Sequence, residues 1–351
     1  ADGQPTGLML EAAAWELVNP LIPEATPEDK FRWLDEAEAM CQRHGITTVG
    51  SMEYSRDVRD VLLARRDALG VRIRVTVLDE RTWPMSFDHL ADVENDDRLA
   101  VIGYKAFLDG TLGSRTAAML EPWADDPDHR GMLVELAARD ELEPWTRAVL
   151  ARGGSPSMHA IGDRAVRLAL DVIDGLDPAD RSRVRIEHAQ HIDATDVARC
   201  AGRRLSMQPL HRYTDGPDAQ RALGPERRAM MFPFRSVRTV GAVLGFGSDW
   251  PVVSPDVLRG IDAAVTGRVT PGDAFLDEAA ERVSAREAVL AYTAGAATIL
   301  ECPDIGHLHP GAWGDVVVLS ADPFAYAWAD RGPSGLEVTM TIQGGRVVHE
   351  R

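Results

Sequence analysis

The chain has 351 residues, of which 45% are hydrophobic, and it carries a formal net charge of -17. This length is enough for one large core, and the negative charge argues against binding to nucleic acid or to an anionic membrane surface, because both would repel the chain at long range. Cys41, Cys200 and Cys302 lie far apart and form no Cys-x-x-Cys pair, so neither a disulfide scaffold nor a zinc ribbon is indicated. A reducing, cytoplasmic location is therefore expected.

In chain order, short apolar runs alternate with longer amphipathic runs, which is typical of successive βα units around a parallel sheet. Helices are expected over residues 27–43 with Thr26 as the N-cap, and over 163–174, 226–240 and 284–300. Two later runs, 315–320 and 338–348, have alternating β character. Seven earlier runs are expected to be strands: residues 46–52, 72–78, 100–108, 155–161, 184–190, 204–210 and 243–249.

Seven βα units are one short of a closed eight-stranded barrel, and an open doubly wound sheet is the structural alternative. We expect an α/β fold over residues 1–300, a (β/α)8 TIM-type barrel whose first strand is missing. Residues 301–351 are expected to be strands of a small β-sandwich domain. Two connections, 109–134 and 211–234, are too long for simple βα turns, and in a barrel both would lie on the catalytic face.

Lys105 is the most informative candidate residue. Lysine and arginine total 38 residues, yet Lys30 and Lys105 are the only lysines. Lys105 lies within an apolar strand, where an ammonium group is costly to bury. It could be a snorkelling or edge-strand lysine, but a desolvated lysine also becomes a nucleophilic amine. Such an amine can capture carbon dioxide and become a carbamate that bridges two metal ions, which arginine cannot do.

His159 and His188 occupy equivalent places at the ends of two successive expected strands. A lone histidine at a strand end is more often structural. Two of them converge in a barrel, however, and neutral imidazole suits zinc and similar metals. Asp249 ends the last expected strand, where it could cap the next helix or could bind metal and accept a proton from the attacking water. Together these positions favour a metal site.

Three further residues are weaker candidates for substrate contacts. His211 follows the sixth strand, Trp250 follows Asp249, and Arg115 lies in the glycine-rich segment 109–116 beside Lys105. That segment lacks Gly-Lys-Ser/Thr, so it does not indicate a phosphate-binding P-loop.

Four motifs resemble the amidohydrolase superfamily, within it the family 3 branch typified by N-substituted formamide deformylase. They are Lys105 through Ala117 (KAFLDGTLGSRTA), His159 through Asp163 (HAIGD), Arg185 through Gln190 (RIEHAQ) and Gly247 through Val252 (GSDWPV). The resemblance implies a site for one or two divalent metal ions, with zinc preferred. In it Lys105 is carboxylated, His159 and His188 bind one metal, and Asp249 serves the other.

The sequence departs from this family in one motif. The family's first barrel strand ends in a His-x-His pair that supplies two metal ligands, and no such pair follows a strand at the start of this chain. His307 and His309 have the spacing, but they precede the terminal strands, and we interpret this as coincidence. We expect that an N-terminal segment is absent, and that it could act as a partner of this chain.

The function expected from these residues is hydrolysis of a non-peptide carbon–nitrogen bond in a small-molecule amide or formamide by a metal-activated hydroxide. The sequence is compatible with two alternatives. The chain could be a truncated, non-catalytic protein with a partial metal site, or a barrel isomerase or phosphoesterase. A homo-oligomer is also compatible with the sequence.

Overall fold

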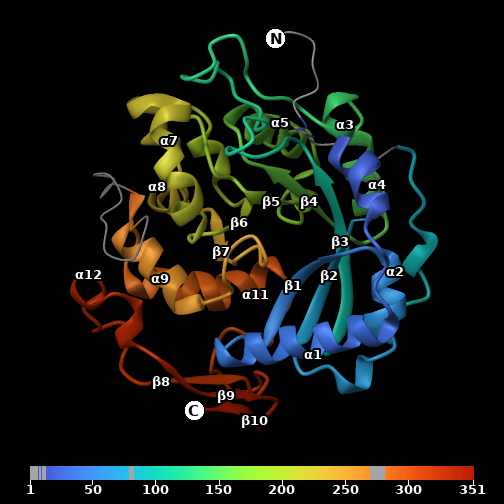
Figure 1. Ribbon diagram of the computed structural model, residues 1–351, viewed down its shortest axis with the longest axis vertical. Helices are drawn as coiled ribbons and strands as arrows, with labels where there is room; N and C mark the ends of the chain where they lie inside the picture. The colour runs from blue at the N-terminus through green and yellow to red at the C-terminus, as the bar shows by residue number, and fades with distance from the viewer. Residues whose placement is uncertain (1–6, 8, 10–12, 79–82, 269–280) are drawn as a thin grey trace.

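The computed structural model describes residues 7, 9, 13–78, 83–268 and 281–351. Its main feature is a sheet of seven parallel strands that follow one another in chain order, and Figure 1 shows that this sheet curls into a half-barrel. The strands are β1 (Thr48–Glu53), β2 (Arg72–Val77), β3 (Leu99–Phe107), β4 (Ser155–Ala160), β5 (Arg185–His188), β6 (Arg204–Met207) and β7 (Val243–Phe246).

The seven expected strands are confirmed, and their order decides between the two topologies. A doubly wound sheet reverses its strand order at a switch point, whereas here each strand pairs with the next in sequence. Strands β1 and β7 end the sheet order, and no pairing joins them within the described residues. The fold is therefore α/β with seven strands of a partial TIM-type barrel.

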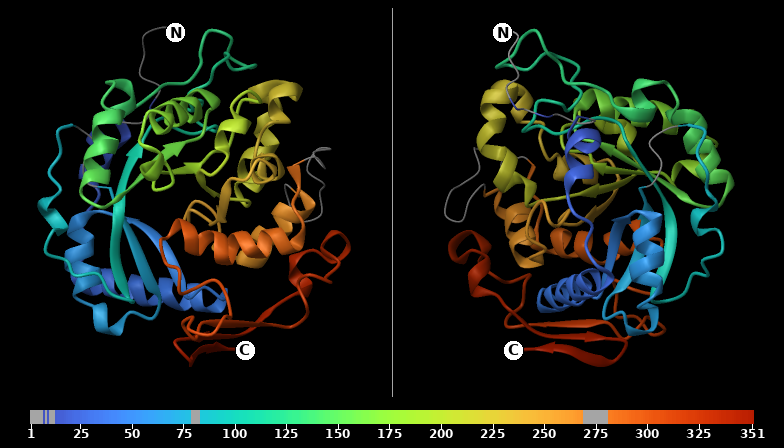
Figure 2. Two further views of the ribbon diagram at one scale, coloured as in Figure 1. Left: turned by 180° about the vertical axis from the view of Figure 1, so that it is seen from behind. Right: turned by 45° about the vertical axis from the view of Figure 1, so that its right-hand side comes forward.

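Helices cover the outer face of the half-barrel, as the two views of Figure 2 show. Helix α1 begins and ends where the sequence predicts, because the Thr26 side chain accepts a hydrogen bond from the Asp29 amide and Pro27 fits the first helical position. The longer helices are α1 (Pro27–Arg43), α4 (Leu142–Ala151), α5 (Asp163–Asp174), α7 (His211–Arg228) and α9 (Val257–Thr266). The shorter ones are α2 (Ser55–Asp57), α3 (Glu135–Ala138), α6 (Pro178–Arg181), α8 (Phe234–Thr239), α10 (Ala285–Leu290), α11 (Ala296–Ile299) and α12 (Trp328–Arg331).

Two expectations for the region after β6 are wrong. Residues 211–234 are not a long loop, because α7 fills most of them, and no single helix runs over 226–240, because α7 ends at Arg228 and α8 begins at Phe234. Helix α7 kinks at Gly224, whose φ of 74° lies in the left-handed region that glycine tolerates. The expected helix over 284–300 forms as α10 and α11 joined by a π-helical turn, Ala291–Gly295.

The C-terminal residues form a separate antiparallel sheet of β8 (Val316–Leu319), β9 (Val338–Gln343) and β10 (Arg346–Glu350). Figure 1 shows α1 between this sheet and the lower part of the half-barrel. The Thr341 hydroxyl donates to the Gln42 carbonyl at 2.7 Å, which ties β9 to the end of α1. In the described part of the chain, every helix is too short or too polar to span a bilayer.

A buried ion pair connects the two sheets. Arg72 Nη1 of β2 lies 2.5 Å from Asp315 Oδ2, and both side chains are only 8% exposed. The Asp315 carboxylate also accepts the Gly344 amide, and the Arg72 guanidinium lies over the Trp313 ring. Since both charges are desolvated, removing one leaves the other uncompensated.

We therefore expect Asp315→Ala to lower the free energy of unfolding by about 3 kcal/mol, measured by urea denaturation. Glu143→Ala is the matched control, because it removes an exposed partner of Arg147 and is expected to cost less than about 1 kcal/mol. Equal effects of the two substitutions would contradict this role of the buried pair.

Candidate active site

The candidate side chains come from the carboxyl ends of four strands. Lys105 lies in β3, His159 in β4 and His188 at the end of β5, while Asp249 follows β7. Because the strands run parallel, their carboxyl ends share one rim of the half-barrel. In the strand register Phe107 pairs with His159, and Ala160 pairs with His188.

Two of these residues have left-handed backbone conformations. The φ angle is 71° at His188 and 56° at Asp249, a region that residues other than glycine rarely occupy. Consecutive residues of a regular strand point to opposite faces. Glu187 and His188 nevertheless both contact the interior face of β4, through Ser157 and His159 respectively. The left-handed turn thus directs His188 toward the interior, and unusual backbone of this kind is common at functional sites.

The structure brings three histidines and one aspartate together at the rim. The ring centroids of His159 and His188 are 4.5 Å apart, and those of His188 and His211 are 5.9 Å apart. His211 Nε2 lies 3.8 Å from Asp249 Oδ2. Potential ligand atoms of His188, His211 and Asp249 all lie within 4.8 Å of one another. His211, which the sequence places at the substrate, thus lies beside the expected metal residues His188 and Asp249.

Hydrogen bonds orient the two strand-end imidazoles. His188 Nδ1 lies 2.9 Å from Gln208 Oε1, which leaves His188 Nε2 free for another partner. His159 Nε2 lies 3.2 Å from the Gly110 carbonyl oxygen. Partners of this kind fix the tautomer and the orientation of metal-binding histidines. The sequence analysis did not identify Gln208, because a glutamine just after a strand carries no distinctive pattern.

Asp109 connects the segment after β3 to the segment after β4. Its buried carboxylate accepts hydrogen bonds from the amides of Ala118, Ile161 and Gly162 at 2.8–3.0 Å, and it lies 3.6 Å from His159 Nε2. Three amide donors satisfy a buried carboxylate well. Asp109 therefore fixes the connection 109–134 against the rim where His159 lies.

Burial sets the protonation of the histidines and of Lys105. It lowers the pKa of His159 to about 3 and the pKa of His188 well below its usual value, and it also lowers the pKa of His211. These rings are therefore neutral near pH 7, the form that binds metal. Burial lowers the pKa of Lys105 as well, while Glu187 and Asp249 raise it. Burial raises the pKa of Asp249, which His211 and Lys105 counteract.

Below the rim, Glu187 compensates two cations inside the half-barrel. Its Oε1 lies 2.7 Å from Arg185 Nε and accepts the Ser157 hydroxyl at 2.6 Å. The fully buried Glu187 carboxylate has a lowered pKa despite its desolvation, because Arg185 and Lys105 stabilise its charge. The buried negative and positive charges below the candidate site thus largely compensate one another.

The other two expected substrate residues lie in different surroundings. Arg115 forms ion pairs with Asp125 at 2.7 Å and Asp218 at 2.6 Å, which raise the pKa of its guanidinium, so its charge is already engaged. Trp250 is 48% exposed and directly follows Asp249, so it remains next to the rim. The long-range partners of Arg115 could not be inferred from its local sequence.

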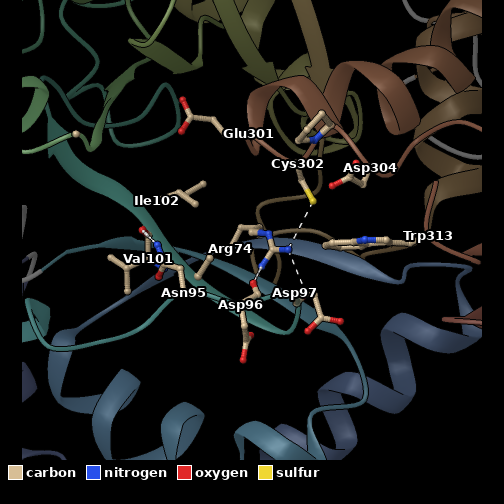
Figure 3. Close-up of a pocket in the computed structure, with 13 residues that line it drawn as sticks. Arg74, Asn95, Asp96, Asp97, Val101, Ile102, Glu301, Cys302, Asp304 and Trp313 are labelled. Atoms are coloured by element: carbon tan, nitrogen blue, oxygen red, sulfur yellow. Dashed lines mark hydrogen bonds between the residues drawn. The ribbon is translucent and has the colours of Figure 1, made fainter. Parts of the chain in front are cut away.

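A cavity of about 380 Å³ lies where strands β2 and β3 begin, away from the candidate residues (Figure 3). Within it an Arg74 nitrogen lies 3.6 Å from Cys302 Sγ, and Trp313 forms one wall. His307 and His309 lie in the connection that lines this cavity at Asp304 and Trp313, and His307 Nε2 lies 2.8 Å from the Pro303 carbonyl oxygen. The contacts of this His-x-His sequence are thus with its own loop.

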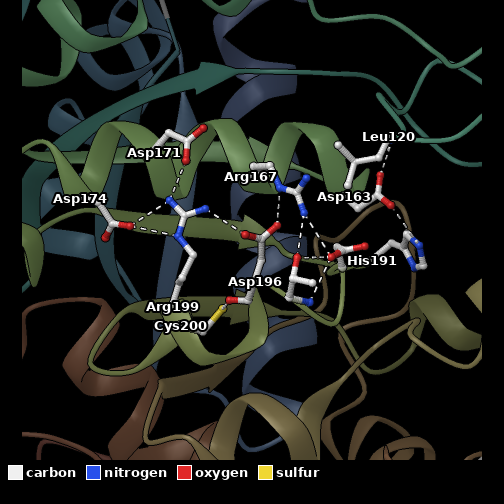
Figure 4. Close-up of polar contacts among 11 residues, drawn as sticks. Leu120, Asp163, Arg167, Asp171, Asp174, His191, Asp196, Arg199 and Cys200 are labelled. Atoms are coloured by element: carbon white, nitrogen blue, oxygen red, sulfur yellow. Dashed lines mark hydrogen bonds and ion pairs between the residues drawn. The ribbon is translucent and has the colours of Figure 1, made fainter.

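Figure 4 shows a second polar cluster at the start of α5. Asp163 accepts the Leu120 amide at 2.7 Å, and its other oxygen lies 3.6 Å from His191 Nε2. Burial raises the pKa of Asp163 to about 6 and lowers the pKa of His191 to about 4. Near pH 5 both groups are therefore uncharged in the folded protein.

The balance of interior charge gives one prediction. Glu187→Gln removes the carboxylate that compensates Arg185 and Lys105, and we expect the free energy of unfolding to fall by about 3–5 kcal/mol. Urea denaturation measures this change, with Glu337→Gln, a substitution at a 42% exposed partner of Arg351, as the control that should stay within about 0.5 kcal/mol. A stability loss no larger than that of the control would refute the compensation.

Asp163 gives a prediction about pH. An acid whose pKa is raised on folding loses stability as pH rises from its unfolded value, 3.8, to its folded value of about 6. Asparagine mimics the protonated carboxyl, so Asp163→Asn and the wild type should have similar stability at pH 4. At pH 7 the variant should be more stable by up to about 3 kcal/mol. Urea denaturation at both pH values tests this, and a stability difference independent of pH would contradict it.

Comparison with known proteins gives one family. The model of the amidohydrolase family matches residues 1–349. The chain is similar to Protein LONG AFTER FAR-RED 3 of Arabidopsis thaliana, with 32% identity over 99% of this chain and 62% of that protein. It is also similar to the putative amidohydrolase YtcJ of Bacillus subtilis, with 30% identity over 100% of this chain and 67% of that protein.

Solved structures agree with this assignment. An uncharacterized metal-dependent hydrolase from Pyrococcus horikoshii matches with a TM-score of 0.76 and 29% identity, over 90% of this chain and 64% of that one. Atrazine chlorohydrolase TrzN from Arthrobacter aurescens, complexed with zinc, shares the fold with a TM-score of 0.55 and 16% identity. The chain spans less than two thirds of the Arabidopsis and Pyrococcus proteins.

Proposed function

Because the chain belongs to the amidohydrolase family, we propose that it forms most of a metal-dependent hydrolase for non-peptide carbon–nitrogen bonds, such as those of N-substituted amides or formamides. The observation that supports this most is the convergence of His159, His188, His211 and Asp249 at one rim of the half-barrel. We also propose that the chain is related to the formamide deformylase branch of the family, which the four sequence motifs at residues 105–117, 159–163, 185–190 and 247–252 support.

The donor set fits a divalent metal ion, with zinc preferred. Three buried, neutral imidazoles and one carboxylate are typical zinc ligands, and His211 Nε2 is buried with no hydrogen-bond partner. In this proposal the metal residues are Lys105, His159, His188 and Asp249, and His211 lies beside them on the side of the substrate. A divalent ion held there would polarise a substrate carbonyl and lower the pKa of bound water.

Asp249 is proposed to move the proton. Its carboxylate is 41% exposed and adjoins the metal residues, so it can contact both an incoming water and the leaving nitrogen. It takes the proton of the attacking water and delivers it to the amine as the carbon–nitrogen bond breaks. Arg115, His211 and Trp250 are proposed to contact the substrate, Arg115 after exchanging one of its carboxylate partners.

Lys105 is proposed to be carboxylated. Burial favours its neutral amine, which can attack carbon dioxide, form a nitrogen–carbon bond and release a proton. The resulting negative charge would lie near the Arg185 guanidinium, which already acts on Lys105 electrostatically. Arg185 would thus replace part of the stabilisation that Glu187 gives to the ammonium form.

The proposal also covers the surroundings of the site. Residues 1–300 would form the hydrolase barrel and 301–351 part of a small β-sandwich. A further polypeptide segment would complete both, which the greater length of the relatives supports. We further propose a cytoplasmic location and a homo-oligomeric assembly, with a small-molecule amide as substrate and neither nucleic acid nor membrane as partner.

The test is turnover by the purified chain in the presence of zinc. We expect amine release from N-substituted amides or formamides, and a loss of at least about 100-fold in kcat for Asp249→Asn. Asp330→Asn, at an exposed residue of α12, is the control and should retain full activity. Turnover of phosphoesters alone, or a fully metallated but inert chain, would refute the proposal in favour of one of its two rivals.

A further inference from the structure

The cavity where β2 and β3 begin contains a buried positive charge that lacks a counter-charge. Arg74 is only 4% exposed, and it forms no ion pair with any residue that the structure describes. Its guanidinium donates to the carbonyl oxygens of Asp96 and Asp97 at 3.1 Å, and its third contact is Cys302 Sγ at 3.6 Å. Because sulfur is a weak acceptor, the guanidinium has a donor available for a stronger, anionic partner.

Two other buried arginines of the parallel sheet have a carboxylate partner. Arg72, two residues before Arg74 on β2, pairs with Asp315, and Arg185 of β5 pairs with Glu187. Buried charges are generally paired, because the desolvation of a lone ion is costly. Arg74 departs from this pattern, and a carboxylate group on a ligand in the cavity would supply the missing charge.

Four carboxylates also line the cavity, and two of them are already compensated. Asp96 and Glu301 each pair with an arginine outside the cavity, at 2.6 Å and 2.7 Å respectively. Asp97 and Asp304 are exposed, and their carboxylates have no ion-pair partner in the described part of the chain. A ligand anion at Arg74 therefore lies near uncompensated negative charge, so a positive group on the same ligand is favourable.

The walls of the cavity limit the size and the polarity of its ligand. The Trp313 ring lies beside the Arg74 guanidinium, 5.6 Å from its central carbon (Figure 3). Val101, Ile102 and Pro303 add to the apolar part of the lining. The volume of about 380 Å³ is near the lower end of the range of about 300–1,000 Å³ that is typical of small-molecule sites. The cavity therefore fits a small molecule with a short apolar part.

We propose that this cavity binds a small apolar α-amino acid. Arg74 binds its carboxylate, Asp97 and Asp304 attract its ammonium group, and its side chain packs on Trp313. An inorganic phosphate would instead bring a second negative charge next to the two free carboxylates. The cavity lies where β2 and β3 begin, whereas the candidate active site lies where the strands end. This is therefore a second ligand site, and it does not rest on the proposed function.

The experiment is calorimetric titration of the full chain with L-alanine, L-valine and L-leucine, and with inorganic phosphate for comparison. We expect at least one amino acid to bind, and Arg74→Met to weaken its binding by about 10–100-fold, because a charge-assisted hydrogen bond at a buried site is lost. Arg32→Met is the matched control at an arginine of α1 whose side chain is 61% exposed, and it should leave the affinity unchanged.

Matched analogues of the amino acid that binds most tightly separate the roles of its two charges. For L-leucine these are 4-methylpentanoate, which lacks the amine, and 3-methylbutylamine, which lacks the carboxylate. Both should bind more weakly than the amino acid. These titrations use the wild-type chain, so they do not depend on the folding of a variant.

Asp304→Asn tests the ammonium contact at an exposed residue, where misfolding is a minor concern. We expect it to weaken amino-acid binding by about 2–5-fold and to leave binding of the deaminated analogue unchanged. Circular dichroism checks that Arg74→Met is folded. The inference would be overturned if no amino acid bound, if Arg74→Met bound as tightly as the wild type, or if phosphate or the deaminated analogue bound at least as tightly as the amino acid.

Discussion

The carboxylate of Glu187 is the charge on which the interior of the half-barrel depends. It lies inside the curled sheet, pairs with Arg185 and acts electrostatically on Lys105, and without it the buried Arg185 guanidinium would lose its carboxylate partner. Buried charge of this kind is tolerated only where it is paired and hydrogen-bonded. The Ser157 hydroxyl completes this pairing by donating to the same carboxylate. The buried charges below the rim are therefore paired, beneath the histidines and Asp249.

The backbone of β5 directs the side chains of two consecutive residues, Glu187 and His188, toward the interior of the half-barrel. Glu187 points into the interior by the ordinary alternation of β5, and the left-handed turn at His188 directs the next side chain to the rim. The same conformation recurs at Asp249 after β7. Such backbone costs about 1–3 kcal/mol where it occurs, and it persists where the surrounding contacts determine it. Gln208, which holds His188, is one such contact.

The sequence predicted most of the fold because its signals are local. Short apolar, β-rich runs mark the seven strands, and Thr26 with Pro27 marks the start of α1. Helix α7 was missed because Gly216, Pro217, Gly224 and Pro225 favour a loop by their local preferences, and tertiary contacts of the buried face override them.

Local sequence signals also predicted part of the candidate site. Strand-end positions identified Lys105, His159, His188 and Asp249 as one group, since parallel strands must bring such residues to one rim. The location of His211 beside them depends on how α7 is anchored, and the engagement of Arg115 depends on Asp218, 103 residues away. Neither relation has a local signature. Spacing can thus identify candidate ligands, whereas only the folded chain shows which of them face one another.

The attachment of the C-terminal sheet has a consequence for synthesis of the chain. Arg72 bonds to Asp315 across 243 residues, and Thr341 bonds to Gln42 across 299. Contacts at such separations slow folding, because a long loop must close before they form. During translation, α1 and β2 emerge long before these partners exist, so their polar groups stay unpaired until β8 and β9 have been synthesised. Completion of the N-terminal part of the fold therefore waits for the C-terminal sheet, and a nascent chain stalled before β8 would be a target for chaperones.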